Sequence, residues 1–187
     1  MIPFFQGKID NFCAIYAVLN AVQLLCKINA FTARSLFNET VLEISRDYYR
    51  FKAVLEHGTD YMELVDHMLG KMCTSYRLLA FKPFEVEQDP KEIWSILSEY
   101  ARPDLGRCAI FRFLRYEAFN STPMADHWTT SKKIDSEGLQ LFDCSLEPLG
   151  LHVIRPKAMV RSKGRHPHEY VVIPAEQIRL LTVPEYL

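Results

Sequence analysis

The fold is decided by residues 6–26, which read QGKIDNFCAIYAVLNAVQLLC. Beyond the cysteine at position 13, apolar side chains recur at the 3.6-residue period of an α-helix. These positions are Ile15, Val18, Leu19, Val22 and Leu25. Asp10 and Asn11 precede the apolar run, and either side chain can cap a helix N-terminus. We therefore expect a buried helix that carries Cys13 in its first turn.

The remainder of the first half also reads as helical. Helices are predicted to start at Thr32, at Asp60 with Glu63 in a capping-box pattern, and at Asp89 followed by Pro90. The first of these is expected to run through Tyr48, and the last to reach about Tyr100.

The second half alternates apolar and polar residues, a pattern typical of strands. Strands are predicted over residues 76–81, 107–116, 127–134, 139–143, 170–173 and 178–183. A short turn at residues 135–138 should join the third and fourth of them as a hairpin. Helices followed by antiparallel strands indicate an α+β fold. The 187 residues suit a single domain, 1–187, with a core that needs no disulfides.

The composition excludes several classes of protein. Hydrophobic residues make up 49% and charged residues 24%, and the net charge is -1, so nucleic acid is not expected as the main partner. No apolar stretch approaches the ~20 residues of a membrane span, so membrane insertion is not expected. The N-terminus lacks the basic and apolar segments of a signal peptide. We expect a cytoplasmic site of synthesis, with later secretion as an effector left open.

The five cysteines are odd in number and scattered, at positions 13, 26, 73, 108 and 144. No CxxC pair and no His/Cys cluster at metal spacing is present, so neither a structural zinc site nor another cofactor is expected. Cys26, Cys73 and Cys108 read as small buried hydrophobes. This usage favours a reducing compartment.

Cys13, His127 and Asp143 together suggest nucleophilic catalysis. The amides and dipole of a helix N-terminus favour the thiolate of Cys13, and a nearby imidazole would favour it further. The 135–138 turn should bring Asp143 close to His127, where the carboxylate can accept the Nδ1 proton. Singly, each residue could equally be a packed cysteine, a packed histidine or a solvated aspartate. Asp126 and Asp135 are rival orienters, but one should point to the other face of its strand and the other lies in the turn.

Gln6 gains meaning from its place seven residues before Cys13. Its side-chain amide could bind an oxyanion together with the Cys13 backbone N–H. His168 also lies at the start of a predicted strand, but no carboxylate follows it at hairpin distance. We therefore prefer His127 as the catalytic histidine.

Gln6, Cys13, His127-Trp128 and Asp143 resemble the papain-like cysteine hydrolases, and most closely the bacterial branch that includes the C39-type leader peptidases. The resemblance covers residues 6–143 but rests on four short motifs. It implies that Cys13 is the nucleophile on the central helix and that Gln6 supplies the oxyanion hole. It also implies that His127 is the base and Asp143 its orienter.

The resemblance implies a hydrolase that cleaves an amide bond of a peptide or protein through an acyl-thioester. Peptidase, glutamine deamidase and amine-transfer activities share this machinery. The alternative is an inactive papain-like module that binds a partner protein, because Ala14 stands where the family usually has glycine. The basic segment Arg155–His168 is either a solvated loop or a surface for an acidic partner.

Overall fold

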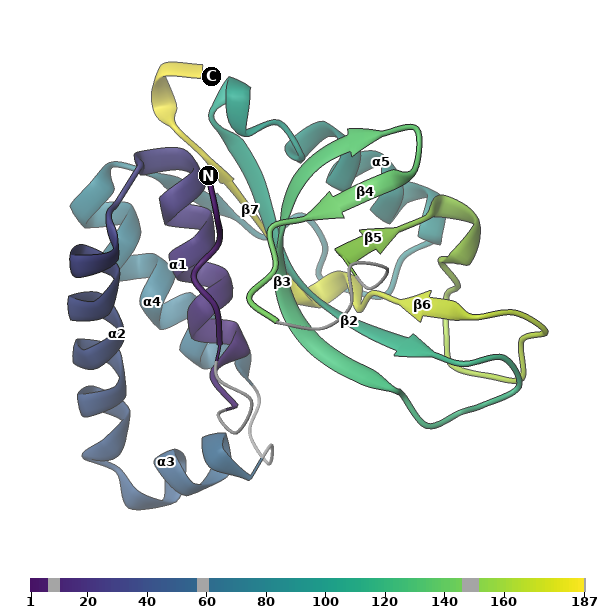
Figure 1. Cartoon of the computed structure of the whole chain (residues 1–187), viewed down its shortest axis with the longest axis horizontal. Helices are drawn as coiled ribbons and strands as arrows, with labels where there is room; N and C mark the ends of the chain where they lie inside the picture. The colour runs from purple at the N-terminus through teal and green to yellow at the C-terminus, as the bar shows by residue number, and fades with distance from the viewer. Residues whose placement is uncertain (7–10, 57–60, 146–151, 187) are drawn as a thin grey trace.

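The computed structural model describes residues 1–6, 11–56, 61–145 and 152–186. Within them the chain has the predicted α+β arrangement, with helices packed on an antiparallel sheet (Figure 1). The helices are α1 (Cys13–Cys26), α2 (Ala30–Ser45), α3 (Tyr48–Leu55), α4 (Tyr61–Tyr76) and α5 (Pro90–Tyr100). The strands are β1 (Leu79–Phe81), β2 (Arg107–Tyr116), β3 (Ala125–Asp135), β4 (Gly138–Leu141), β5 (Val153–Ile154), β6 (Tyr170–Val172) and β7 (Ile178–Thr182).

The strands of the described residues form one sheet in the order β1-β7-β2-β3-β4-β5. β2 lies at its centre and pairs along one edge with β3. Along its other edge β2 pairs with β7 over its first half and with β6 over its last residues. The hairpin of β3 and β4 turns between Asp135 and Gly138, as the sequence predicted.

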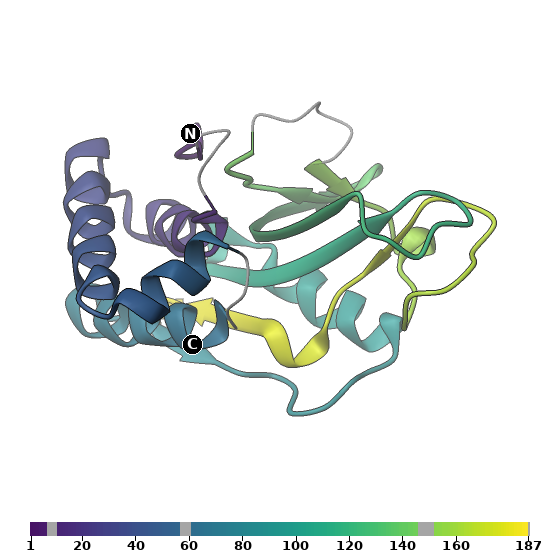
Figure 2. The same cartoon turned by 90° about the horizontal axis from the view of Figure 1, so that it is seen from below.

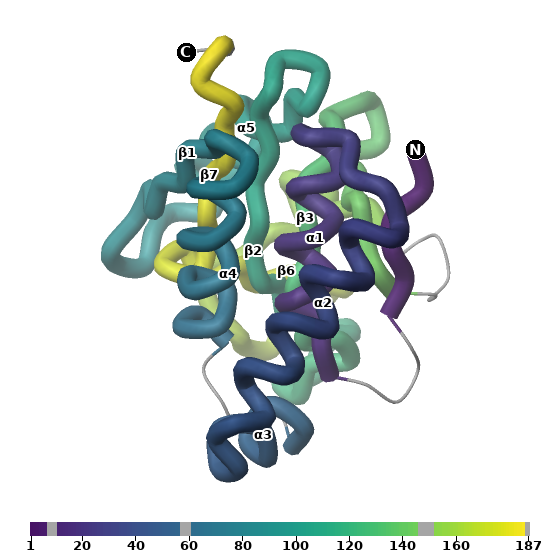
Figure 3. The backbone as a smooth tube through the Cα atoms, turned by 90° about the vertical axis from the view of Figure 1, so that its left-hand side faces the viewer, coloured from purple at the N-terminus to yellow at the C-terminus, as the bar shows by residue number. Residues whose placement is uncertain are grey.

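The sheet separates two hydrophobic clusters because side chains alternate across it. Cys108 and Ile110 of β2 pack with α1, α2 and α4. The intervening Ala109 and Phe111 face α5 on the other side. Figures 2 and 3 show α2 and α4 outside α1, so that α1 lies between them and the sheet. This position explains why α1 is apolar around nearly its whole circumference.

The N-terminal segment lies along α1 (Figure 1). The side chain of Asn20, itself fully buried, accepts a hydrogen bond from Phe4 N at 2.7 Å and donates one to Phe4 O at 3.2 Å. Gln23 Nε2 donates to Ile2 O at 3.1 Å. These polar residues of an otherwise apolar helix therefore hold the backbone of the segment that ends at Gln6.

Several predicted helix starts are corrected. Asn11 does not cap α1, because its side chain donates to Leu55 O instead. The capping residue of α2 is Asn29, whose side chain accepts a hydrogen bond from the backbone amide of Thr32. Asp47 caps a separate helix, α3, so the helix predicted through Tyr48 is broken in two. Asp10 and Asp60 lie outside the described residues.

Other predictions are confirmed or adjusted slightly. Asp89 caps α5 and Pro90 begins it, as predicted. The strand predicted from Tyr76 starts at Leu79, because Tyr76 still belongs to α4. The two-residue β5 was not predicted. In the described parts of the chain, no helix combines the length and apolar character needed to cross a membrane.

Candidate active site

Cys13 is the first residue of α1, and the residue before it, Phe12, supplies no side-chain cap. The amide groups of the first turn are therefore left without a capping side chain, which suits an anionic sulfur at this end of the helix. Cys13 is 5% exposed and its side chain hydrogen-bonds with His127. The thiol and the imidazole, 114 residues apart in sequence (127 − 13), thus meet where α1 begins against β3.

His127 lies near the start of β3, opposite Phe113 of β2, and their rings meet edge to face with centroids 5.9 Å apart. Its Nε2 atom lies 3.1 Å from Oδ1 of Asp143. The predicted carboxylate partner is therefore in place, but the predicted nitrogen, Nδ1, is wrong. Asp143 lies diagonally across from His127, so the ring nitrogen farther from the backbone is the one that reaches it.

A β-bulge places the Asp143 side chain on the side of the strand that faces His127. The pairing of β3 with β4 runs Ile134 with Leu139, then shifts by one residue between Ser131 and Lys133. Beyond the shift, Phe142 N donates to Thr130 O at 2.7 Å. Continued by one residue, this register sets Asp143 beside Thr129, on the same face of the strand as His127. Without the bulge the carboxylate would face the opposite side.

The contact between His127 and Asp143 favours the charged form of both side chains. Burial alone would lower the pKa of His127, but hydrogen bonds with Asp143, Cys13 and Cys144 raise it well above the ordinary 6.5. Burial would raise the pKa of Asp143, yet the hydrogen bond and charge of His127 bring it below its usual value. The amide of Ser145 also donates to Asp143 Oδ1, at 2.8 Å. The arrangement therefore favours an imidazolium–carboxylate pair.

The rival orienters are engaged elsewhere. Asp126 pairs with Arg112, whose Nε lies 2.6 Å from its Oδ1. Asp135 stays in the turn, where Lys133 Nζ lies 3.0 Å from its Oδ2. Both placements agree with the predicted geometry. Of the three aspartates, Asp143 is the one that contacts His127.

Gln6 reaches the site through Cys144. Its backbone N donates to Cys144 O at 2.8 Å, and its side-chain Oε1 lies 3.5 Å from Cys144 Sγ. Burial raises the pKa of Cys144 to about 11, so the group is a thiol near neutral pH and can donate to that oxygen. The Cys144 side chain therefore lies between Gln6 and the imidazole, and the side-chain carbonyl of Gln6 faces Cys144.

Sequence reasoning missed two residues of this cluster. Cys144 Sγ lies 3.6 Å from His127 Nε2, and His152 Nδ1 lies 4.0 Å from Asp143 Oδ1. The position of Cys144 directly after the candidate orienter was an available signal. No sequence pattern pointed to His152. His166 instead contacts the ring of Tyr170, and His168 is exposed.

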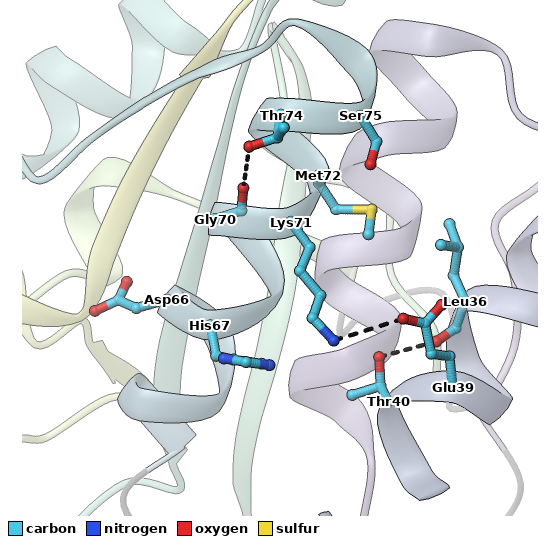
Figure 4. Close-up of a pocket in the computed structure, with 10 residues that line it drawn as sticks. All are labelled: Leu36, Glu39, Thr40, Asp66, His67, Gly70, Lys71, Met72, Thr74 and Ser75. Carbon is cyan, nitrogen blue, oxygen red and sulfur yellow. Dashed lines mark hydrogen bonds and ion pairs between the residues drawn. The ribbon is translucent and has the colours of Figure 1, made fainter. Parts of the chain in front are cut away.

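A cavity of about 400 Å³ adjoins the site. Its lining includes Asp143 and His152, the apolar Phe5 and Phe142, and Lys132 of the bulge. It provides a way in from solvent beside the carboxylate. A second cavity, of about 630 Å³, lies away from the site between α2 and α4 (Figure 4). There Lys71 is paired with Glu39 and Glu43.

Comparison with protein-family models and with curated protein sequences finds no match. The candidate roles therefore rest on the geometry of the side chains themselves. That geometry joins a thiol at a helix N-terminus, an imidazole and a buried carboxylate. It also brings a side-chain amide to the same place. Such a set can form and break an acyl–sulfur bond.

Proposed function

We propose that this protein is a papain-like thiol hydrolase that acts on an amide bond of a peptide or protein. The observation that carries the proposal is that one imidazole, His127, contacts both Cys13 and Asp143. A nucleophile, a base and a group that orients the base are the recurring parts of such sites. The position of Cys13 at the start of α1 adds the helix N-terminus that favours a thiolate.

The proposed reaction has two halves. The Cys13 sulfur attacks the amide carbon, while the carbonyl oxygen becomes an oxyanion held by the Cys13 N–H and the Gln6 amide. His127 protonates the departing nitrogen, which leaves a thioester. His127 then takes a proton from water, whose oxygen attacks the thioester and releases the acid and the free thiol. Because Nε2 faces Asp143, Nδ1 is the nitrogen that exchanges the proton.

The substrate decides which activity results. Cleavage of a backbone amide and removal of a glutamine side-chain nitrogen use the same steps, and an amine that replaces water gives transfer. The family relationship to the C39-type peptidases remains part of the proposal. So does an acidic partner for the Arg155–His168 loop, where Arg155, Lys157 and Arg165 are exposed.

The inactive binding module is less favoured. That alternative was based on Ala14, which stands where the family usually has glycine. Ala14 is fully buried and belongs to the cluster between the helices and the sheet. Its methyl group therefore contributes to packing and gives no reason to assign the site a purely binding role.

The test is a screen of peptide amides and glutamine-containing proteins, read by mass spectrometry. New peptide ends indicate a peptidase, glutamine converted to glutamate indicates a deamidase, and an added amine indicates transfer. A thioester-linked adduct should accumulate on Cys13 after acid quenching. Cys13→Ala should abolish every product, while Cys73→Ala, a matched change on α4, should not. Turnover that survives Cys13→Ala would refute the proposal.

A further inference from the structure

We propose that Cys144, His127 and Asp143 form a zinc site that is separate from the nucleophile Cys13. Their donor atoms (one sulfur, one nitrogen and one oxygen) lie within 4.8 Å of one another. The residues come from the start of β3 and from the two positions after Phe142, so the hairpin itself assembles the site. The spacing of these three residues along the chain follows no known zinc-ligand pattern, so the sequence analysis did not predict the site.

The distances suit a tetrahedral ion. Zinc binds nitrogen and oxygen at about 2.0–2.2 Å and sulfur at about 2.3 Å. In a tetrahedral site, a nitrogen ligand therefore lies about 3.3 Å from an oxygen ligand and about 3.6 Å from a sulfur ligand. The separations here are 3.1 Å from His127 Nε2 to Asp143 Oδ1 and 3.6 Å from Nε2 to Cys144 Sγ. The third separation, from the carboxylate to Cys144 Sγ, is within 4.8 Å, so these two side chains would move towards the ion to complete the set.

The carboxylate provides a second indication. Asp143 is 4% exposed, and its Oδ2 atom accepts no hydrogen bond within the described residues. A buried carboxylate oxygen without a partner is costly, and a bound cation would satisfy it. Asp143 also lines the 400 Å³ cavity, which therefore adjoins one side of the proposed site.

The chemistry of the donors selects the metal. One thiolate, one imidazole and one carboxylate make a mixed set that suits zinc, whereas calcium and magnesium require oxygen ligands. Three protein ligands leave the fourth position for water, as in open zinc sites. Binding converts the Cys144 thiol to a thiolate, and its proton leaves to solvent. The imidazolium releases its Nε2 proton to solvent, binds the metal through Nε2 and keeps its other proton on Nδ1.

Zinc in this position would inhibit the enzyme, a consequence that rests on the proposed function. With Nε2 bound to the metal, Nδ1 would keep its proton and have no free electron pair, so the imidazole could no longer take up and release a proton during the reaction. Binding itself does not depend on the proposed function, because Cys13 is not a ligand. The two ideas can therefore fail independently.

The experiment titrates the purified, reduced protein with Zn²⁺ against a chromogenic chelator. One ion should bind per chain, and Cys144→Ala should weaken it by more than the about 10–100-fold that loss of an outer-shell partner costs. Cys13→Ala and Cys73→Ala should bind as the wild type does. Circular dichroism checks that each variant is folded.

Cobalt(II) gives a second measurement that needs no change at Cys144. The Cys13→Ala protein loaded with Co²⁺ should show the near-ultraviolet absorption of a cobalt–thiolate bond at one ion per chain. Loss of this band in Cys13→Ala would assign the metal to Cys13 and overturn the proposal. So would an unchanged zinc affinity in a folded Cys144→Ala protein, or no stoichiometric binding by the wild type.

Discussion

Asp143 Oδ1 lies 3.1 Å from His127 Nε2, although β4 ends two residues earlier, at Leu141. The contact depends on the one-residue shift of register between Ser131 and Lys133. The shift places Asp143 on the same strand face as His127. A local irregularity of one hairpin thus determines which nitrogen of the imidazole contacts the carboxylate.

Replacement of Asp143 by asparagine should slow acylation while the fold persists. Asparagine keeps the shape but removes the charge that stabilises imidazolium. Because a thiolate depends less on a base than a serine hydroxyl does, the loss should stay below the about 10⁴-fold found in serine triads. Asp126→Asn and Asp135→Asn are the matched controls, because their carboxylates face Arg112 and Lys133. The measurement is the rate of acyl-enzyme formation. A clear loss in Asp126→Asn, with none in Asp143→Asn, would transfer the role.

Gln6→Ala should separate two reactions of the same thiol. Acyl transfer builds an oxyanion, so its rate should fall by about 10²–10³-fold when the donor is removed. Alkylation of Cys13 by iodoacetamide builds none, so its rate should stay close to that of the wild type. Gln140→Ala, whose side chain contacts Asp135, is the control. Equal losses in both reactions would mean that Gln6 acts on the thiol and not on the oxyanion.

Asn20→Ala should destabilise the protein. The change leaves the partly buried N–H and C=O groups of Phe4 without the partners that Asn20 provides, at a cost of about 1–3 kcal/mol. Urea unfolding followed by circular dichroism gives the difference. Asn38→Ala, an exposed change on α2, should alter stability little. Similar values for the two variants would show that the N-terminal segment is not held by Asn20.

The raised pKa of Tyr61 predicts that the folded protein loses stability at alkaline pH. Its hydroxyl donates to Val54 O at 2.9 Å, and burial, followed by the nearby charge of Cys13, raises its pKa from 10.0 to about 12. The folded state then holds the phenol proton more tightly than the unfolded state, so this stabilisation is complete below pH 10 and is lost as the pH rises towards 12. Urea unfolding at a series of pH values measures it.

Tyr61→Phe should remove that part of the alkaline dependence, whereas Tyr49→Phe, which alters a side chain that is 82% exposed, should not. An unchanged alkaline profile in Tyr61→Phe would contradict the assignment.

The sequence was sufficient for the parts of the fold set by periodicity and local capping. The apolar repeat of α1 predicted a buried helix with Cys13 in its first turn, and the Asp89-Pro90 pair predicted the start of α5. The hairpin turn followed from its short connection. Asn11 failed as a cap because its side chain donates to Leu55 O, and Thr32 failed because Asn29 caps the helix three residues earlier.

The finer geometry of the site could not be predicted. No residue type marks the bulge beside Lys132, so neither the diagonal approach of Asp143 nor its choice of Nε2 was visible. Cys144 and His152 join the site only because the hairpin and β5 bring them there. Their positions depend on the tertiary structure, which local sequence patterns do not predict.

The central claim, that Cys13 is a nucleophile activated by His127, is tested most directly by limited iodoacetamide labelling near neutral pH. Peptide mass spectrometry locates the adduct among the five cysteines. We predict that Cys13 is modified first and that His127→Ala slows this reaction selectively, while His67→Ala leaves it unchanged. Labelling of Cys26 or Cys73 ahead of Cys13, or a Cys13 rate that His127→Ala does not alter, would contradict the account.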